Sequence, residues 1–412
     1  MEITVREKLD KAIRRHRTAD VTLTVRDRRG RPLADAPLVV QQTRHQFLFG
    51  CNAFSILGLD VPEQTAAYRK RFAELLNFAT LPFYWRGYEK DEHKPQTRRL
   101  KAMAAWCASH GVRPKGHPLV WHNSQPEWIQ DRSLAEFERL QMRRVVRDVR
   151  QFRGLVDTWD VINETEILPR FTLPLDRLPR LCHMIGRVEI IKRSFDAARA
   201  ANPNATLILN DYETSPAYEE IIERCLDAGV GIDIIGIQSH MHTGYWGAEK
   251  TADVLRRFSR FRKPIHFTEL TILSGKLKDI NDTDWESRHE NWTTTDDGEL
   301  RQAEQAADFY RVLFAHPAVE AITWWDFCDQ KSWMGAPSGF LRADASPKPM
   351  YDELKKTIKG EWWTGPLKLR TDGDGRASFR AFLGTHIVKA NGRRIEFAVD
   401  RPDTIEAAVR LT

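Results

Sequence analysis

The stretch Trp159-Asp160-Val161-Ile162-Asn163-Glu164 decides how this chain is interpreted, because a strand-like alternation runs straight into an amide and a carboxylate. Asp, Asn and Glu are depleted in strands. When such residues gather at the end of a strand, they mark either a turn or a functional site. The residues that follow the other strands distinguish these two cases.

Short apolar runs alternate with helical patterns through the middle of the chain. The expected strands are residues 46–51, 75–80, 112–120, 156–163, 206–210, 232–238, 264–269 and 321–327. Segments with apolar residues at helical spacing lie between them, for example 97–111 and 134–152. Eight such alternations predict an α/β fold, a (β/α)8 TIM barrel. A doubly wound sheet is the alternative, but no Gly-x-Gly-x-x-Gly turn follows any strand.

Both ends of the chain carry short runs of alternating apolar and polar residues. In residues 20–50 they flank the turn "RRGRP", and in residues 361–412 they flank the turns "DGDG" and "NG", so we expect short antiparallel strands in both segments. We expect a small β-sandwich-like appendage built from residues 1–45 and 361–412, with the barrel at 46–360. The rival is a separate C-terminal sugar-binding module, although about 50 residues would give it little core of its own.

Composition argues against several classes of protein. The 63 basic and 57 acidic residues give a net charge of +6 with both signs interspersed, and we find no nucleic-acid motif, so we expect no nucleic-acid partner. No apolar stretch reaches about 18 residues, so we expect no membrane partner. The 13 Trp residues are many for 412 positions, and exposed aromatic rings often serve as flat binding platforms.

The cysteines and histidines give no metal pattern. The chain has no Cys-x-x-Cys pair, and its five cysteines are expected to be mostly reduced: Cys51, Cys107, Cys182, Cys225 and Cys328. Cys51 and Cys328 end strands that would be neighbours in the barrel, so a disulfide between them is geometrically feasible. The pair His240 and His242 lacks an acidic or Cys partner at ligand spacing. We therefore expect no metal and no organic cofactor.

The N-terminus, "MEITVREKLD", is charged and does not resemble a secretory signal. We expect a cytoplasmic protein if the chain is complete as written, and a secreted or periplasmic one if a signal was removed. We expect a monomer.

Polar and aromatic residues follow the expected strands, at the end of the barrel where the active sites of this fold lie. They are His117, Trp121, His122, Asn163, Glu164, Tyr212, Gln238, His240, Glu269, Trp325 and Trp333. Amides and imidazoles bond hydroxyl groups, and indole faces stack on the C–H surfaces of sugars. The set therefore suits a neutral, hydroxyl-rich ligand.

Glu164 and Glu269 end two different strands, as the cleavage of a glycosidic bond requires. One carboxylic acid protonates the leaving oxygen, while the other carboxylate attacks the anomeric carbon or activates water. Burial and a neighbouring negative charge would raise the pKa of the acid. Asn163 is placed to bond a sugar hydroxyl, and His240 to orient Glu269. The alternative is that each Glu is a satisfied surface or capping residue.

Six motifs, in order along residues 50–354, resemble glycoside hydrolase family 10, which is best known for endo-β-1,4-xylanases. They are "GHPLVWHNSQPEW", "WDVINE", "LNDY", "GIDIIGIQSHMHTG", "HFTEL" and "TWWDFCDQKSW". The resemblance implies a retaining, double-displacement mechanism with Glu164 as acid/base and Glu269 as nucleophile. It places Tyr212 on the leaving-group side. The residues that it places on the glycone side are His122, Asn163, Gln238, His240, Trp325 and Trp333.

The chain departs from this family after the second strand. The family usually has Thr-x-Glu-Asn-x-Met-Lys-Trp there, whereas this chain reads "TLPFYWRG" from Thr80 to Gly87. Pro82 and Phe83 stand where the family has Glu and Asn, and Arg86 stands where it has Lys. A polar sugar grip has become apolar and aromatic, and we expect Tyr84 and Trp85 to wall that end of the site. The change reflects either divergent packing or an altered glycone side.

Residues 271–300 form an unusually long connection after the seventh strand. Loops of this length are usually functional or disordered, and Trp285 and Trp292 argue against full disorder. The segment could roof the cleft near Glu269, or it could pack on the side of the barrel.

The leading hypothesis is a retaining β-glycoside hydrolase that cleaves xylan or xylo-oligosaccharides in the manner of an endo-β-1,4-xylanase. An enzyme acting on another β-glycan, a short oligosaccharide or an aryl or terpenoid glycoside is the alternative, favoured by the altered segment. A carbohydrate-binding protein that has lost catalysis is the rival from a different class.

Overall fold

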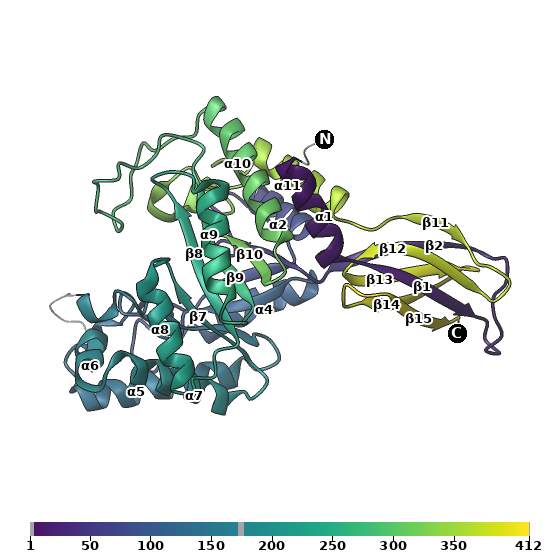
Figure 1. The fold of residues 1–412 in the computed structure, drawn as a ribbon. Coiled ribbons are helices and arrows are strands. Elements are labelled where there is room, and N and C mark those ends of the chain that lie inside the picture. The colour runs from purple at the N-terminus through teal and green to yellow at the C-terminus, as the bar shows by residue number, and fades with distance from the viewer. Residues whose placement is uncertain (1–3, 172–176, 412) are drawn as a thin grey trace. The chain divides into compact units, whose positions relative to one another are not determined.

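The computed structural model describes residues 4–171 and 177–411 (Figure 1). Parallel strands close into a barrel in the order β10-β3-β4-β5-β6-β7-β8-β9. The strands are β3 (Leu48–Asn52), β4 (Phe78–Pro82), β5 (Arg113–His117), β6 (Thr158–Asn163), β7 (Thr206–Asp211), β8 (Ile234–Met241), β9 (Ile265–Ile272) and β10 (Val319–Trp324). The predicted (β/α)8 barrel is therefore confirmed, and each of its strands overlaps an expected one.

Helices connect consecutive barrel strands, as the alternating pattern predicted. They are α2 (Pro62–Leu75), α3 (Trp85–Tyr88), α4 (Thr97–Ser109), α5 (Leu134–Gln151), α6 (Arg177–Ile185), α7 (Arg187–Ala201), α8 (Pro216–Asp227), α9 (Gly247–Ser259) and α10 (Asp296–Ala315). Helix α5 illustrates the local cause. Ser133 caps its first turn by accepting a hydrogen bond from the N–H of Glu136, and Phe137, Leu140 and Val145 bury one face.

Close packing inside the barrel depends on a glycine beside a tryptophan. Trp159 is fully buried, and a Cβ added at Gly116 would lie 2.2 Å from its ring atom Cζ3. The packed core cannot absorb that methyl group without moving the indole or the strand. Gly116 immediately precedes His117, so the same packing fixes the strand end that carries this imidazole.

We expect Gly116→Ala to lower the free energy of unfolding by about 1–3 kcal/mol, because overpacking forces side chains and backbone to shift. Urea denaturation measures the change. Gly58→Ala is the matched control, since a Cβ there meets nothing within 4 Å. An equal effect of both substitutions would contradict this account of the packing.

Strand register brings the polar strand ends together. Asn163 of β6 is paired with Asn210 of β7, and Gln238 of β8 is paired with Glu269 of β9. The β8–β9 register shifts immediately before Gln238, leaving Thr268 unpaired between two partners. Such bulges re-aim side chains and are common next to active sites.

The terminal segments build two further sheets, and the purple strands β1 and β2 lie among the yellow strands in Figure 1. One sheet has the order β12-β1-β15 and the other β11-β2-β13-β14. Their strands are β1 (Thr18–Arg26), β2 (Pro37–His45), β11 (Leu367–Arg370), β12 (Arg376–Phe382), β13 (Gly384–Ala390), β14 (Arg393–Val399) and β15 (Ile405–Arg410). One apolar cluster, which includes Leu23, Val40 and Val388, draws residues from both ends of the chain. The appendage built from both termini is thus confirmed.

The terminal unit also contains features that the sequence did not predict. Strand β1 pairs with β15 in parallel, although short antiparallel strands were expected. Helix α1 (Val5–Arg17) precedes β1 and begins with a capping box between Thr4 and Glu7. Helix α11 (Pro349–Lys356) follows the barrel and leads into a π-helical turn at Thr357–Glu361.

The chain divides into two compact units. One comprises Phe49–Gln302 and Ala318–Lys348, and the other comprises Met1–Leu48, Ala303–Pro317 and Pro349–Thr412. The second half of α10 thus groups with the terminal segments, whereas the sequence assigned all of residues 46–360 to the barrel. The expected domain limits stay a prediction.

Candidate active site

Glu164 leaves strand β6 in an unusual backbone conformation. Its φ is +57°, a left-handed value that costs energy for a residue with a side chain, and its N–H donates to the carbonyl oxygen of Asn210 at 2.8 Å. The turn ends the strand and presents the carboxylate at the barrel mouth, by which we mean the carboxyl ends of the strands. The acidic residue at the strand end therefore marks a functional position: the strand stops because the chain turns and directs the largely buried Glu164 carboxylate into the mouth.

Three donors hold the Glu164 carboxylate. The indole N–H of Trp121 donates to Oε2 at 2.8 Å, while the side-chain amides of Asn163 and Gln238 donate to Oε1 at 3.0 and 3.3 Å. Burial nevertheless raises the pKa of Glu164 to about 8, and the negative charge of Glu269 adds to the increase. Glu164 is therefore largely protonated at neutral pH and has a proton to donate.

Glu269 is buried within strand β9 and has an environment of the opposite kind. The Asn210 amide donates to Oε1 at 2.8 Å, and Nε2 of His240 lies 3.2 Å from Oε2. Burial alone would raise the pKa of Glu269, but the attraction of His117 and the hydrogen bond from His240 hold it below its usual value. Glu269 is therefore ionised at neutral pH.

An amide bridge joins the two carboxylates. The side-chain nitrogen of Asn210 donates both to Oδ1 of Asn163, at 2.7 Å, and to Glu269. Gln238 likewise donates to Oδ1 of Asn163 at 3.2 Å and to Glu164. Because each carboxylate is bonded to amides that are bonded to one another, the pair is held in a fixed relative position. A Cβ at Gly236 would lie 2.6 Å from Oδ1 of Asn210, so this glycine leaves the space that the amide occupies.

A buried charge cluster supports Glu269 from below. Lys115 and His117 both bond Oδ2 of Asp160, at 2.5 and 2.7 Å, and all three side chains are buried. Burial would raise the pKa of Asp160, but the charge of Lys115 and the hydrogen bond from His117 lower it. Asp160 thus keeps the proton of His117 on Nδ1 and points Nε2 at Glu269, 3.8 Å away. Asp160, the buried acid inside the expected strand, is therefore explained by its pairing with Lys115 and His117.

Aromatic rings surround the carboxylate pair. Trp325 packs edge-on against His117 and His240, with ring centroids 5.3 and 5.8 Å apart, and Trp333 lies 4.7 Å from His240. Tyr84 lies 5.3 Å from the His117 ring. Its ring also lies 5.6 Å from that of Trp121, whose indole bonds Glu164. Burial raises the pKa of Tyr84, and the charges of Glu269 and Glu164 raise it further.

Of the remaining predicted residues, some lie beside the carboxylates and others do not. His122 lies 3.8 Å from Oε2 of Glu164, and Tyr212 is 42% exposed on the Glu164 side, whose charge contributes to its raised pKa. Trp85 is instead buried, with its indole N–H on Glu89 and its ring against Trp128, so the structure does not bring it to the carboxylates. Arg86 is exposed and donates to the carbonyl oxygen of Gln125 at 3.1 Å.

Several supporting residues were missing from the predicted set. Asn210, Asp160 and Lys115 organise the carboxylates, and Phe54 packs on Trp325 at 5.5 Å. Of these, Asn210 stands in the motif "LNDY" at a predicted strand end, but the sequence assigned it no role. Polar residues inside otherwise apolar strands were the available signal for the first three. Phe54 carries no such signal, because an aromatic residue after a strand is most often core.

The described residues hold neither a disulfide nor a metal cluster. All five cysteines within them are free and buried, so the feasible Cys51–Cys328 disulfide does not form. In the same part of the chain, no group of three or more His, Cys, Asp or Glu side chains could hold a metal ion. None of its helices is both long and apolar enough to span a bilayer.

A (β/α)8 barrel that holds one protonated carboxyl group just after β6 and one ionised carboxyl group inside β9, three residues before its end, has the arrangement on which glycoside hydrolysis depends. Residues 65–357 match the family described as "Glycosyl hydrolase family 10". Because the match covers more than half of the chain, the protein belongs to glycosyl hydrolase family 10.

Individual relatives agree with this assignment. The endo-1,4-beta-xylanase/feruloyl esterase of Xylanibacter ruminicola is 25% identical over 361 residues, covering 79% of this chain and 48% of that protein. Endo-1,4-beta-xylanase A of Cellvibrio japonicus is 26% identical over 289 residues, covering 63% of this chain and 46% of that protein. The chain thus spans about half the length of these two relatives.

Solved structures share the fold. Native xylanase 10B from Thermotoga maritima superposes with a TM-score of 0.64 at 23% sequence identity. The superposition covers 77% of this chain and 96% of that chain. At this level of identity, the likeness supports the barrel alone.

Proposed function

We propose that the protein is a retaining glycoside hydrolase of the endo-β-1,4-xylanase type, acting on xylan or xylo-oligosaccharides. The single observation that supports this most strongly is a pair of buried carboxyl groups, linked through side-chain amides, whose surroundings shift their pKa values in opposite directions. Glu164 has a pKa of about 8 and is a proton donor at neutral pH, whereas the pKa of Glu269 is lowered and it is a nucleophile. Family membership and the names of the relatives support the choice of substrate.

In the first step, a carboxylate oxygen of Glu269 attacks the anomeric carbon. The bond from that carbon to the leaving oxygen breaks, and Glu164 gives its proton to the leaving oxygen. In the second step, the Glu164 carboxylate takes a proton from water while the water oxygen attacks the same carbon and releases Glu269. Two inversions at the anomeric carbon leave its configuration unchanged.

The test is product analysis on xylotriose, xylan, mixed-linkage glucan and aryl β-xylosides and β-glucosides. We expect cleavage of the β-1,4-xylosidic substrates, with the β-anomer as the first product seen by proton NMR. Failure to cleave any β-xyloside would reject the proposed substrate, and an α-anomer as first product would reject the retaining mechanism. Cleavage of aryl β-glucosides alone would favour the alternative of an altered glycone site.

A further inference from the structure

The long connection between β9 and α10, visible as the green loop before α10 in Figure 1, is closed at its base. Gly275 and Thr294 form an antiparallel bridge, so the intervening residues make one excursion between two fixed points. We call residues 276–293 the strap. It includes Trp285, whose side chain is 38% exposed.

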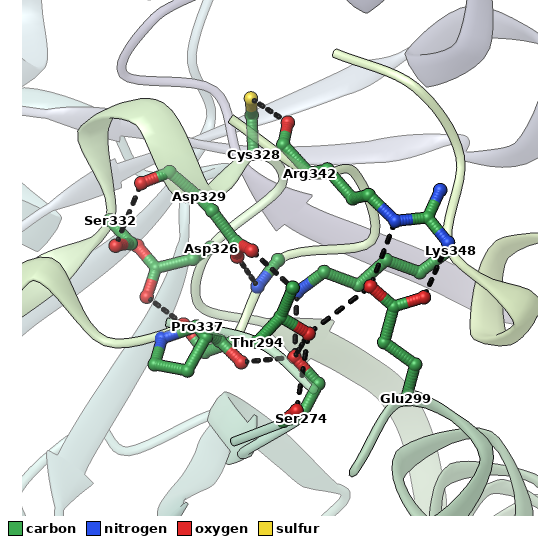
Figure 2. Close-up of polar contacts among 12 residues, drawn as sticks. Ser274, Thr294, Glu299, Asp326, Cys328, Asp329, Ser332, Pro337, Arg342 and Lys348 are labelled. Atoms are coloured by element: carbon green, nitrogen blue, oxygen red, sulfur yellow. Dashed lines mark hydrogen bonds and ion pairs between the residues drawn. The ribbon is translucent and has the colours of Figure 1, made fainter. Parts of the chain in front are cut away.

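Ser274 and Thr294 lie just outside the two ends of the strap, and Figure 2 shows how they are anchored to the loop that follows β10. Ser274 and Thr294 hydrogen-bond each other through their hydroxyls at 2.8 Å. The buried Lys348 donates to Ser274 at 2.9 Å and pairs with Asp329 at 2.6 Å. Glu299, which follows Thr294 in the chain and accepts a hydrogen bond from its hydroxyl at 3.1 Å, also accepts one from Arg342 at 2.8 Å. The strap therefore has fixed ends on the same loop that carries Trp333.

The middle of the strap reaches the opposite side of the barrel. The side-chain amide of Asn123, in the loop after β5, donates to Oε1 of Glu286 at 2.6 Å. In the closed strand order, three strands separate β5 from β9 in either direction, so the two loops start at opposite points of the ring. The contact therefore joins two loops that start on opposite sides of the barrel mouth.

Trp285, the neighbour of Glu286, shows where the strap runs. Its ring stacks on Trp333 at 6.2 Å and packs edge-on against His242 at 5.7 Å. Trp333 in turn lies against His240, the partner of Glu269. Consecutive strap residues thus touch the Glu269 side of the mouth and the loop after β5, which also carries Trp121, the indole that bonds Glu164.

The mechanism identifies this side as the glycone side. The sugar that becomes bonded to Glu269 is the glycone, whereas the departing part of the substrate lies beyond Glu164, near the exposed Tyr212. Tyr84 and Phe54 pack against each other at 5.8 Å, and Phe54 also packs on Trp325, which lies against His240. The glycone region is therefore flanked by aromatic rings from the barrel and crossed by the strap.

We infer that the strap makes the glycone side a closed site that admits a short glycone. The enzyme then takes xylo-oligosaccharides and the ends of xylan chains in preference to interior bonds of the polymer. This inference rests on the proposed hydrolysis of β-1,4-xylosidic bonds. It keeps the proposed mechanism and replaces endo action by action near chain ends. It assigns Trp285, Glu286 and Asn123 as determinants of substrate length.

The experiment compares polymer with oligomer in the full-length protein. The ratio of kcat/KM on soluble xylan to kcat/KM on xylotriose is measured, together with the fall in viscosity of the xylan. One variant replaces residues 277–292 by an Asn-Gly turn, which the existing Gly275–Thr294 bridge can accommodate. A second variant, Glu286→Ala, removes only the contact to Asn123. Glu290→Ala is the matched control, an exposed carboxylate on the same strap.

We expect the natural protein to shorten xylohexaose from its non-reducing end while the viscosity of xylan falls slowly. Shortening the strap should raise the polymer-to-oligomer ratio at least about 10-fold, with a smaller rise for Glu286→Ala and none for Glu290→Ala. If the shortened protein does not fold, the polymer-to-oligomer ratios of Glu286→Ala and Trp285→Ala test the inference instead. Rapid loss of viscosity with the natural protein, or an unchanged ratio in the strap variants, overturns the inference. Absence of xylotriose cleavage in every protein instead rejects the proposed function.

Discussion

Glu269→Gln is expected to lower kcat by at least about 10⁴-fold, on the scale seen when the nucleophile of a covalent mechanism is removed. The amide has no negative charge with which to attack the anomeric carbon, so the glycosyl intermediate cannot form. Initial rates on xylotriose, with the release of xylose and xylobiose followed by chromatography, measure the effect.

The substitution fits the site without new unsatisfied groups, which makes the result interpretable. In the natural protein, His240 donates from Nε2 to the ionised Glu269 and accepts from the hydroxyl of Thr271 at Nδ1. Facing the amide of a glutamine, His240 can exchange tautomers, accept at Nε2 and donate to Thr271. Asn210 can still donate to the glutamine oxygen. Affinity for xylo-oligosaccharides should therefore survive, as isothermal titration would show.

Glu249→Gln is the matched control, because it makes the same chemical change on the exposed first turn of α9. Its turnover should equal that of the natural protein. If Glu269→Gln kept substantial turnover, Glu269 would not be the nucleophile. If the natural protein bound oligosaccharides with no turnover at all, the carbohydrate-binding alternative would hold.

The sequence predicted the barrel because apolar runs and helical patterns alternated over most of the chain. It also singled out Glu164 and Glu269, because two carboxylates at the ends of different strands, among amides, imidazoles and indoles, are not explained by capping. The resemblance of the surrounding motifs to glycoside hydrolase family 10 assigned their roles. The register that pairs Gln238 with Glu269 lay beyond local pattern, because it depends on a bulge that leaves Thr268 unpaired.

Contacts between distant segments were the part that the sequence could not supply. Trp85 and Tyr84 are adjacent in an aromatic run, yet Trp85 is buried against Trp128, whereas Tyr84 packs against His117 and Trp121. Their separation follows from the short helix α3, which begins at Trp85. The length of the strap suggested a functional loop, but its contact with Asn123 joins residues 163 positions apart. A contact between residues so far apart in the chain leaves no periodic pattern in the sequence from which it could be predicted.

Glu164→Gln is expected to slow hydrolysis of xylotriose by about 10³-fold, within the range that general acid–base catalysis contributes. A sugar is a poor leaving group, so its oxygen needs the proton that Glu164 supplies. On a dinitrophenyl β-xylobioside the leaving group departs without a proton, and the first step should proceed at nearly its natural rate. The second step still needs a base to activate water, so a burst of dinitrophenol should precede slow turnover.

The pH dependence of kcat/KM checks the same assignment independently. Glu164 acts in its protonated form, and its pKa of about 8 means that this form is lost as the pH rises through about 8, so activity should fall there. Glu269 acts in its ionised form, and its lowered pKa puts the acidic fall in activity below pH 4.5. In Glu164→Gln, assayed with the dinitrophenyl substrate, the alkaline fall should vanish while the acidic one stays. An alkaline fall that persisted in this variant would belong to another group, and the raised pKa of Glu164 would then have no part in catalysis.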